Sequence, residues 1–337
     1  MLVRREKQRN PVADEVLALT AVVRPILAGV LYGLKADVAK EVGGYDNVKL
    51  KLLPRLRRQG DGDIGICFEY AVHEAMNNKD ARVLERINDA ISLCKIKTAA
   101  PKSILFGLEK SGSFQLIATA RDILTDDSRV LAGLKQGGQP PKLKRRLSIL
   151  ASAFSRPATR VTLPSSIQGL WKADLFVGSV DTQQWVGTSV KINPAHLEAA
   201  AGLRIGIVPT RAGQNDKVVA DEKRGLVICP LHHDQDFMQV FYEGFRVVQA
   251  FLLAGAKIPK EAIMPGPVGR EVCRILEQRR EFPVVDVMEA LVAFGQPELL
   301  DSDEEQVDLL QLKGDAETAT MIAPVSRDTM PPKHRGR

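Results

Sequence analysis

The chain has 337 residues, with 47 Lys and Arg against 41 Asp and Glu, so its formal net charge is +6. Apolar residues make up 45% and charged residues 26%, which excludes a fully disordered chain and a coiled coil. Four scattered cysteines without a Cys-x-x-Cys pair exclude a disulfide-rich secreted scaffold and argue against a zinc knuckle. The longest apolar stretch, 16–34, is interrupted by Arg24-Pro25 and is too broken for a membrane span. We expect a soluble, cytoplasmic protein of about two domains.

The first half of the chain is predicted to be mainly helical. Apolar side chains recur at helical spacing in four segments, and Pro25 is expected to bend or split the first of them. Residues 1–58 are expected to form an N-terminal helical region, followed by a core over 59–255 with an insertion around 95–160. The predicted elements are helices over 14–42, 47–58, 64–77 and 80–94, a strand over 103–108 and a helix over 115–124.

Beyond residue 160 the pattern changes to short apolar runs rich in β-branched residues, which favour strands. The predicted elements are strands over 160–163, 173–180, 185–192, 203–208 and 225–229, a short helix over 194–201, a polar loop over 211–223 and a long helix over 235–253. Residues 256–300 are expected to add C-terminal helices, and 301–337 a mobile tail. His232-His233-Asp234 contains metal-ligand residue types, but Asp234 is better explained as the N-cap of the long helix.

Three of these predicted elements carry polar side chains at apolar positions. Glu69 lies inside the helix over 64–77, Asp174 opens one strand, and Ser189 and Lys191 end the next. A strand interior disfavours Asp and Lys unless the protein gains something from them. These residues are therefore candidates for a functional site.

A hairpin would bring the strand residues together. A turn centred between Thr182 and Gln183 pairs Asp174 with Lys191, and opposed residues have Cβ atoms about 4.5–5.5 Å apart. A carboxylate beside an ammonium can bind a divalent cation and orient water against a phosphate.

The order of these residues resembles the PD-(D/E)xK nuclease superfamily, which has the restriction-endonuclease-like fold. Asp174 is followed by 14 residues and then by Ser189-Val190-Lys191. The resemblance implies an α/β core of order α-β-β-β-α-β, a mixed sheet flanked by helices, over about 64–208. It also implies Mg²⁺- or Mn²⁺-dependent hydrolysis of DNA phosphodiester bonds, a role in restriction, anti-phage defence or DNA repair, and a homodimer.

Ser189 departs from the usual pattern because it occupies the second acidic position. In this it is similar to the restriction enzymes that cut CCGG-type sites, where a Glu on the following helix supplies the missing carboxylate. Glu198 is the candidate here, although it follows Lys191 at a shorter spacing than in that subgroup. The resemblance implies that Asp174 is the principal metal ligand, that Glu69 and Glu198 are secondary ligands, and that Lys191 orients the nucleophile beside Ser189.

A compact basic cluster precedes this candidate hairpin. It consists of Lys142, Lys144, Arg145 and Arg146, and it is either a DNA contact or a solvated helix face.

Two alternatives to an enzyme remain open. Asp174 and Lys191 could form a structural ion pair, and Glu69 could be an exposed helix residue. The chain would then be a non-catalytic nucleic-acid-binding or interaction module with a degenerate nuclease fold. A weaker alternative is a helical interaction protein.

Overall fold

The computed structural model of the chain describes residues 2–4, 13–34, 40–57, 63–106, 123–131, 140–211, 217–233, 236–260, 266–295 and 309–311. The chain divides into two units. In the unit formed by Met1–Pro11 and Asp303–Arg337, β1 (Leu2–Arg4) pairs antiparallel with β9 (Leu309–Gln311). The rest of the predicted tail and residues 115–122 of the helix predicted over 115–124 lie outside the described residues. The unit Val12–Ser302 contains all the other helices and strands that the structure describes.

A mixed sheet forms the centre of this unit, with the strand order β2-β4-β5-β6-β8-β7, while β3 pairs with the first residues of β5. β4 pairs antiparallel with both β2 and β5, and β6 pairs parallel with both β5 and β8. The predicted α/β class with a mixed sheet is therefore confirmed. The strands are β2 (Lys102–Leu105), β3 (Arg129–Val130), β4 (Leu175–Ser179), β5 (Gln184–Val190), β6 (Leu203–Thr210), β7 (Val219–Asp221) and β8 (Leu226–His232).

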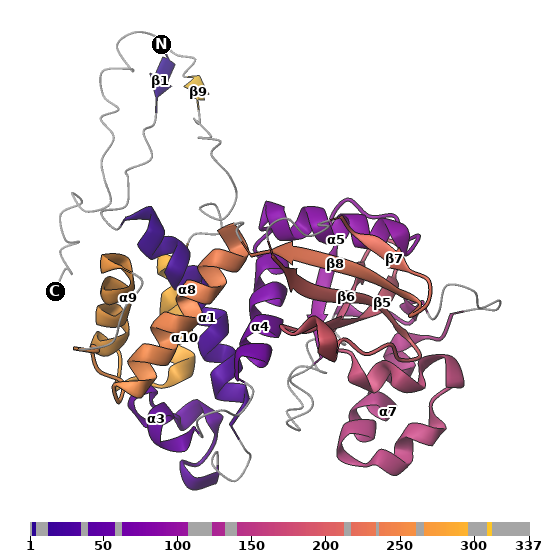
Figure 1. The fold of residues 1–337 in the computed structure, drawn as a ribbon, viewed down its shortest axis with the longest axis horizontal. Coiled ribbons are helices and arrows are strands. Elements are labelled where there is room, and N and C mark those ends of the chain that lie inside the picture. Colours follow the sequence, from indigo (N-terminus) through magenta and orange to yellow (C-terminus); the bar gives the residue numbers. More distant parts are fainter. Residues whose placement is uncertain are drawn as a thin grey trace, which may run out of the picture. The chain divides into compact units, whose positions relative to one another are not determined.

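A helical layer covers one face of the sheet (Figure 1). α4 (Asp63–Asn77) contacts β2 and β5, and α5 (Ala81–Leu93) covers β8. On its other side α4 packs against α1 (Asp14–Tyr32), which also contacts α8 (Asp236–Leu253), α9 (Pro267–Gln278) and α10 (Val284–Phe294). Helices from both ends of the unit thus form one bundle beside α4.

α1 is long and apolar enough to cross a membrane by length and composition, but 72% of that stretch is buried inside the protein. Pro25 lies within the helix and is itself buried, so α1 is a single core helix rather than two. This helix ends at Tyr32, ten residues before the predicted end of the segment.

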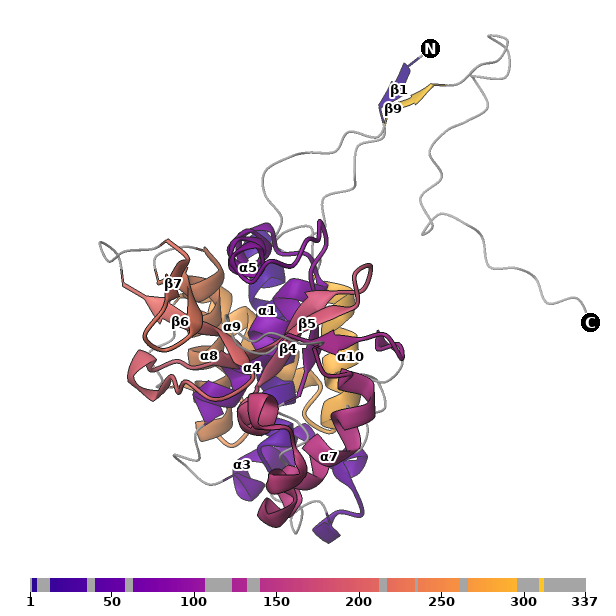
Figure 2. The same cartoon turned by 90° about the vertical axis from the view of Figure 1, so that its right-hand side faces the viewer.

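The opposite face of the sheet carries a separate lobe, defined here as residues 140–173 and called the basic lobe (Figure 2). It contains α7 (Leu143–Ser155) and two 3-10 segments, η4 (Pro157–Thr162) and η5 (Ser165–Lys172). Its inward side chains pack with the sheet residues Phe176 and Trp185 in a second core. Those inward side chains are Leu143, Leu147, Leu150, Leu163, Ile167 and Leu170.

Four predicted elements differ from the structure. The strand expected over 160–163 belongs to η4, where the hydroxyls of Thr159 and Thr162 donate to carbonyls three residues earlier and favour a turn. The helix expected over 194–201 is only the 3-10 turn η6 (Pro194–His196). The helix over 47–58 is broken into η1 (Tyr45–Asn47), η2 (Leu50–Leu52) and α3 (Leu53–Leu56), and β7 lies in the expected polar loop.

Long-range pairing explains the broken helix. The backbone N–H of Leu50 donates to the carbonyl of Phe282, and that of Val284 donates to the carbonyl of Val48. Those backbone groups therefore bond to a distant segment instead of to the next helical turn.

The predicted hairpin register was also wrong, by two residues. Leu175 pairs with Thr188 and Ser179 with Gln184, so the turn is centred between Asp181 and Thr182. Gln183, the last turn residue, has a positive φ of 51°. A shift of two residues keeps each side chain on its predicted face.

Candidate active site

Asp174 is fully buried at the entry to β4. Its Oδ2 accepts hydrogen bonds from the backbone N–H of Val190 at 2.8 Å, from Lys191 Nζ at 2.7 Å and from Ser189 Oγ at 3.3 Å. Its own backbone N–H donates to the carbonyl of Thr188 at 2.9 Å. Because a buried carboxylate needs such partners, the end of β5 sets the direction of this side chain.

Lys191 links two carboxylates that are far apart in the sequence. Its Nζ lies 2.7 Å from Asp174 Oδ2 and 3.7 Å from Glu69 Oε1. The lysine side chain remains 29% exposed, whereas the two acids are buried. The structure therefore brings together the predicted residues Glu69, Asp174, Ser189 and Lys191, and the side chain of Lys191 is the most exposed of the four.

Glu69 is 8% exposed, so it is not the exposed helix residue of the alternative interpretation. Its helix α4 is anchored to the sheet one turn further on, where His73 Nδ1 and Ser103 Oγ of β2 are 2.5 Å apart. Asn77 Nδ2 is 3.0 Å from His73 Nε2, so His73 accepts there and its Nδ1 donates to the serine. Burial lowers the pKa of His73 to about 4 and keeps the ring neutral at pH 7.

Glu198 lies outside this cluster. Its carboxylate is 61% exposed and forms an ion pair with Lys172 at the end of η5. The hydrogen bond and charge of Lys172 lower the pKa of Glu198, and the charge of Lys191 lowers it further. Within the described ranges, no three His, Cys, Asp or Glu side chains group as a metal site. The predicted ligand set of Asp174, Glu69 and Glu198 is therefore not assembled in this conformation.

Asp174 and Glu69 nevertheless suit a hard divalent cation. Carboxylate oxygens are the donors that Mg²⁺ and Mn²⁺ prefer, and Mg²⁺ usually binds through one or two carboxylates, several waters and substrate phosphates. Both acids already approach one cation, the ammonium of Lys191. The hydroxyl of Ser189 adds a third oxygen at the same place.

The basic cluster Lys142–Arg146 lies at the start of α7 and just before it. Lys142 is 4.0 Å from Asp127 and Lys144 is 3.5 Å from Asp126, so carboxylates offset part of this charge. Arg145 is exposed. The cluster is at the surface, and its contribution to nucleic-acid binding remains a prediction.

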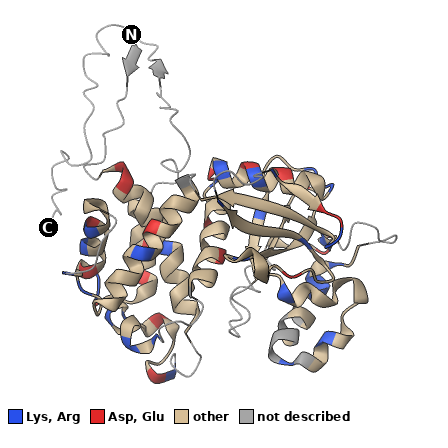
Figure 3. Ribbon diagram, viewed as in Figure 1, with Lys and Arg blue, Asp and Glu red and all other residues tan. Residues whose placement is uncertain are grey.

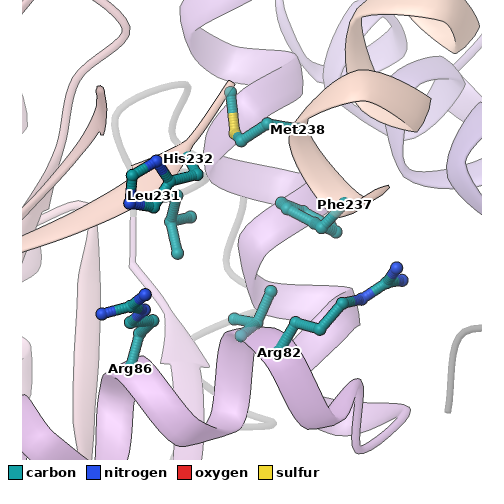
Figure 4. Close-up of a pocket in the computed structure, with 7 residues that line it drawn as sticks. Arg82, Arg86, Leu231, His232, Phe237 and Met238 are labelled. Atoms are coloured by element: carbon teal, nitrogen blue, oxygen red, sulfur yellow. The ribbon is translucent and has the colours of Figure 1, made fainter. Parts of the chain in front are cut away.

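A small cavity lies near the carboxyl end of β8, between α5 and α8 (Figure 4). Arg82, Arg86 and His232 line it together with the apolar side chains Val83, Leu231, Phe237 and Met238. The cavity measures about 20 Å³, room for about one water molecule. We therefore assign it no ligand. The neighbouring His233 stacks on Tyr242 with ring centroids 4.8 Å apart.

Two cationic side chains near the cluster were missed in the sequence. Lys172 contacts Glu198, and the guanidinium of Arg160 lies 3.6 Å from the centre of the Trp171 ring. The sequence contained a signal for these two cations, because the segment 140–173 that carries them has no Asp or Glu.

Comparison of the chain with protein-family models, with curated proteins and with solved structures finds no significant match.

Proposed function

We propose that the chain is a metal-dependent nuclease that hydrolyses DNA phosphodiester bonds at the cluster of Glu69, Asp174 and Lys191. The observation that carries the proposal is the approach of two buried carboxylates to one lysine, at 2.7 and 3.7 Å. Buried ionised groups are costly unless they are used or paired, and such clusters concentrate at functional sites.

The order of the elements supports the same proposal. α4 with Glu69 is followed by the antiparallel strands β2, β4 and β5, then by η6 and by β6 parallel to β5. This order resembles the α-β-β-β-α-β order of the restriction-endonuclease-like core, with the short strand β3 as an additional element between β2 and β4. In this chain α5 is added after α4, the basic lobe precedes β4, and the second helix is reduced to η6.

The residues have distinct roles in this proposal. Asp174 and Glu69 would hold Mg²⁺ or Mn²⁺, which when bound polarises the phosphate and lowers the pKa of a bound water. Lys191 contacts both acids and is partly exposed, so it could orient the attacking water and offset charge that develops on the phosphate. Ser189 fixes Asp174 through its hydroxyl and adds no second negative charge on β5.

A second candidate is a nucleic-acid-binding module that retains this core without cleaving. Ser189 in place of an acid and the pairing of Glu198 with Lys172 favour it. In that case the Asp174–Lys191 contact is a structural ion pair.

Incubation of the purified protein with supercoiled plasmid DNA separates the two candidates. The nuclease proposal predicts nicked or linear products with Mg²⁺ or Mn²⁺ and intact plasmid with a chelator. Retarded but uncut plasmid under all conditions would favour the binding module instead. Single-stranded RNA in a parallel reaction tests the preference for DNA.

A further inference from the structure

The basic lobe has an unusual balance of charge. Its 34 residues contain seven cationic side chains and no carboxylate. Figure 3 shows Lys and Arg positions along α7 and on the segments around it. The seven are Lys142, Lys144, Arg145, Arg146, Arg156, Arg160 and Lys172.

The second core explains why these cations are at least partly exposed. The lobe buries leucine and isoleucine side chains against Phe176 and Trp185, so its polar positions remain at the surface. The lobe ends at Ala173, and the next residue is Asp174 of the candidate site. A polyanion bound along the lobe would therefore extend towards the candidate site at Asp174.

One of these cations is held in a defined place. The guanidinium of Arg160 in η4 lies 3.6 Å from the ring centre of Trp171 in η5, and Lys172 Nζ lies 5.4 Å from the same ring. A guanidinium stacked on an indole can still donate hydrogen bonds in its own plane, and stacking reduces the entropy lost when it does so.

The stacked pair is connected to the candidate site by charge and by packing. Lys172 pairs with Glu198, and the pKa of Glu198 responds to Lys191 as well as to Lys172. The segment that carries Glu198 is held against η5, since the backbone N–H of Gly169 donates to the carbonyl of Ala201. A Cβ on Gly169 would approach Ala200 Cβ to 2.5 Å.

We propose that Arg160, held on Trp171, binds the sugar-phosphate backbone of the nucleic acid on the Asp174 side of the basic lobe, with Lys172 as the neighbouring contact. This inference deepens the proposed function by assigning a substrate contact to the same site. Contacts of this kind position the strand and carry no base specificity.

The test measures binding rather than cleavage. A short fluorescein-labelled DNA duplex is titrated with protein in chelator, at several salt concentrations, and followed by fluorescence anisotropy. The variants are Arg160→Gln and Trp171→Leu, with Arg224→Gln as the matched control. Arg224 is a 52% exposed arginine that pairs with Asp221 in the β7–β8 turn. It lies at the opposite edge of the sheet from the candidate site, because it precedes the amino end of β8 whereas Lys191 follows the carboxyl end of β5.

We expect Arg160→Gln to weaken binding about tenfold and to lower the slope of log Kd against log salt by about 0.9, the value for one phosphate contact. Trp171→Leu keeps the charge and should weaken binding severalfold with little change in slope. Arg224→Gln should bind like the wild type, and it and Arg160→Gln should melt like the wild type. Trp171 packs against the second core, so Trp171→Leu should melt at a lower temperature and is assayed below that temperature.

Unchanged affinity and slope in Arg160→Gln would overturn the inference, as would an equal loss in Arg224→Gln. A wild type that does not bind DNA would overturn it as well. A wild type that binds but does not cut with Mg²⁺ would refute the proposed nuclease while leaving this binding contact supported.

Discussion

Asp174 is a buried carboxylate that links the start of β4 to the end of β5. Its Oδ2 accepts a backbone N–H, a lysine ammonium and a serine hydroxyl, all from three consecutive residues at and just beyond the end of β5. Removal of one member of a buried ion pair typically costs about 3–5 kcal/mol, because the other charge is left uncompensated. The candidate site is therefore also part of what stabilises the β4–β5 hairpin.

Metal binding to this site can be measured without any substrate. A ligand that binds only the folded protein at ten times its Kd stabilises it by about 1.4 kcal/mol. We therefore expect Mn²⁺ to raise the Tm of the wild type by a few degrees, and Glu69→Gln to lose this shift. Glu198→Gln is the matched control and should keep the Tm shift, because Glu198 forms an ion pair with Lys172 outside the cluster of Glu69, Asp174 and Lys191. Equal shifts in wild type and Glu69→Gln would refute Glu69 as a metal ligand.

His73 gives stability a defined pH dependence. Burial lowers its pKa to about 4 in the folded protein, while the unfolded value is about 6.5. The folded-state pKa is depressed, so below pH 6.5 the unfolded chain binds a proton that the folded chain excludes. The free energy of unfolding should therefore fall by up to about 1.4 kcal/mol per pH unit from pH 6.5 down to pH 4.

Chemical denaturation at several pH values checks this expectation. The carboxylates of the protein also lose stabilising interactions in acid, so the informative quantity is the difference between wild type and His73→Gln. We expect the difference to change across pH 6.5–4 and to be constant above pH 7. A constant difference over the whole range would contradict a neutral His73 with a lowered pKa.

At the scale of elements, the position of Glu69 depends on how closely α1 and α4 approach. A Cβ on Gly29 of α1 would lie 2.9 Å from Cys67 Cα and 3.0 Å from Cys67 N, which are backbone atoms of α4. Cys67 also donates its thiol hydrogen to the carbonyl of Ile26. Glycine at this position therefore sets the distance between α1 and the helix that carries Glu69.

A pair of glycine substitutions tests this contact. Gly29→Ala should destabilise the protein by about 1–3 kcal/mol, because α1 and α4 must separate. Gly65→Ala is the control within α4, where a Cβ meets no atom within 4 Å; it should stabilise the helix by about 0.5–1 kcal/mol. Denaturant melts measure both changes. Destabilisation of the same size in both variants would contradict the close-packing explanation.

The elements also show what the sequence could predict. Periodicity identified α4, α5 and α8 within about one residue at each end, and apolar runs identified β4, β5, β6 and β8. The segment over 47–58 was mispredicted because its backbone bonds with residues near 282, a long-range partner that local pattern does not contain. Glu69, Asp174, Ser189 and Lys191 were found since polar residues interrupted apolar elements, whereas the pairing of Glu198 with Lys172 depends on how the 193–202 segment packs.

At the scale of the molecule, helices from both ends of the Val12–Ser302 unit form one bundle that supports α4, and the sheet lies on the other side of α4. The basic lobe covers the opposite face of the sheet from α4 and α5. The candidate site lies where α4 meets the ends of β4 and β5. The net charge of the chain is only +6, but the basic lobe, which directly precedes Asp174 in the sequence, contains seven cations and no acid.

We propose that Asp174, Glu69 and Lys191 form a metal-dependent phosphodiesterase site. The most direct test is the initial rate of plasmid cleavage in Mg²⁺ by wild type, Lys191→Met and Lys102→Met. Lys102 is an exposed lysine on the neighbouring strand β2, so it controls for loss of one surface charge. We predict at least about a 100-fold loss in Lys191→Met and a wild-type rate in Lys102→Met. Undiminished cleavage by Lys191→Met, or no cleavage by the wild type with any divalent metal, would contradict the claim.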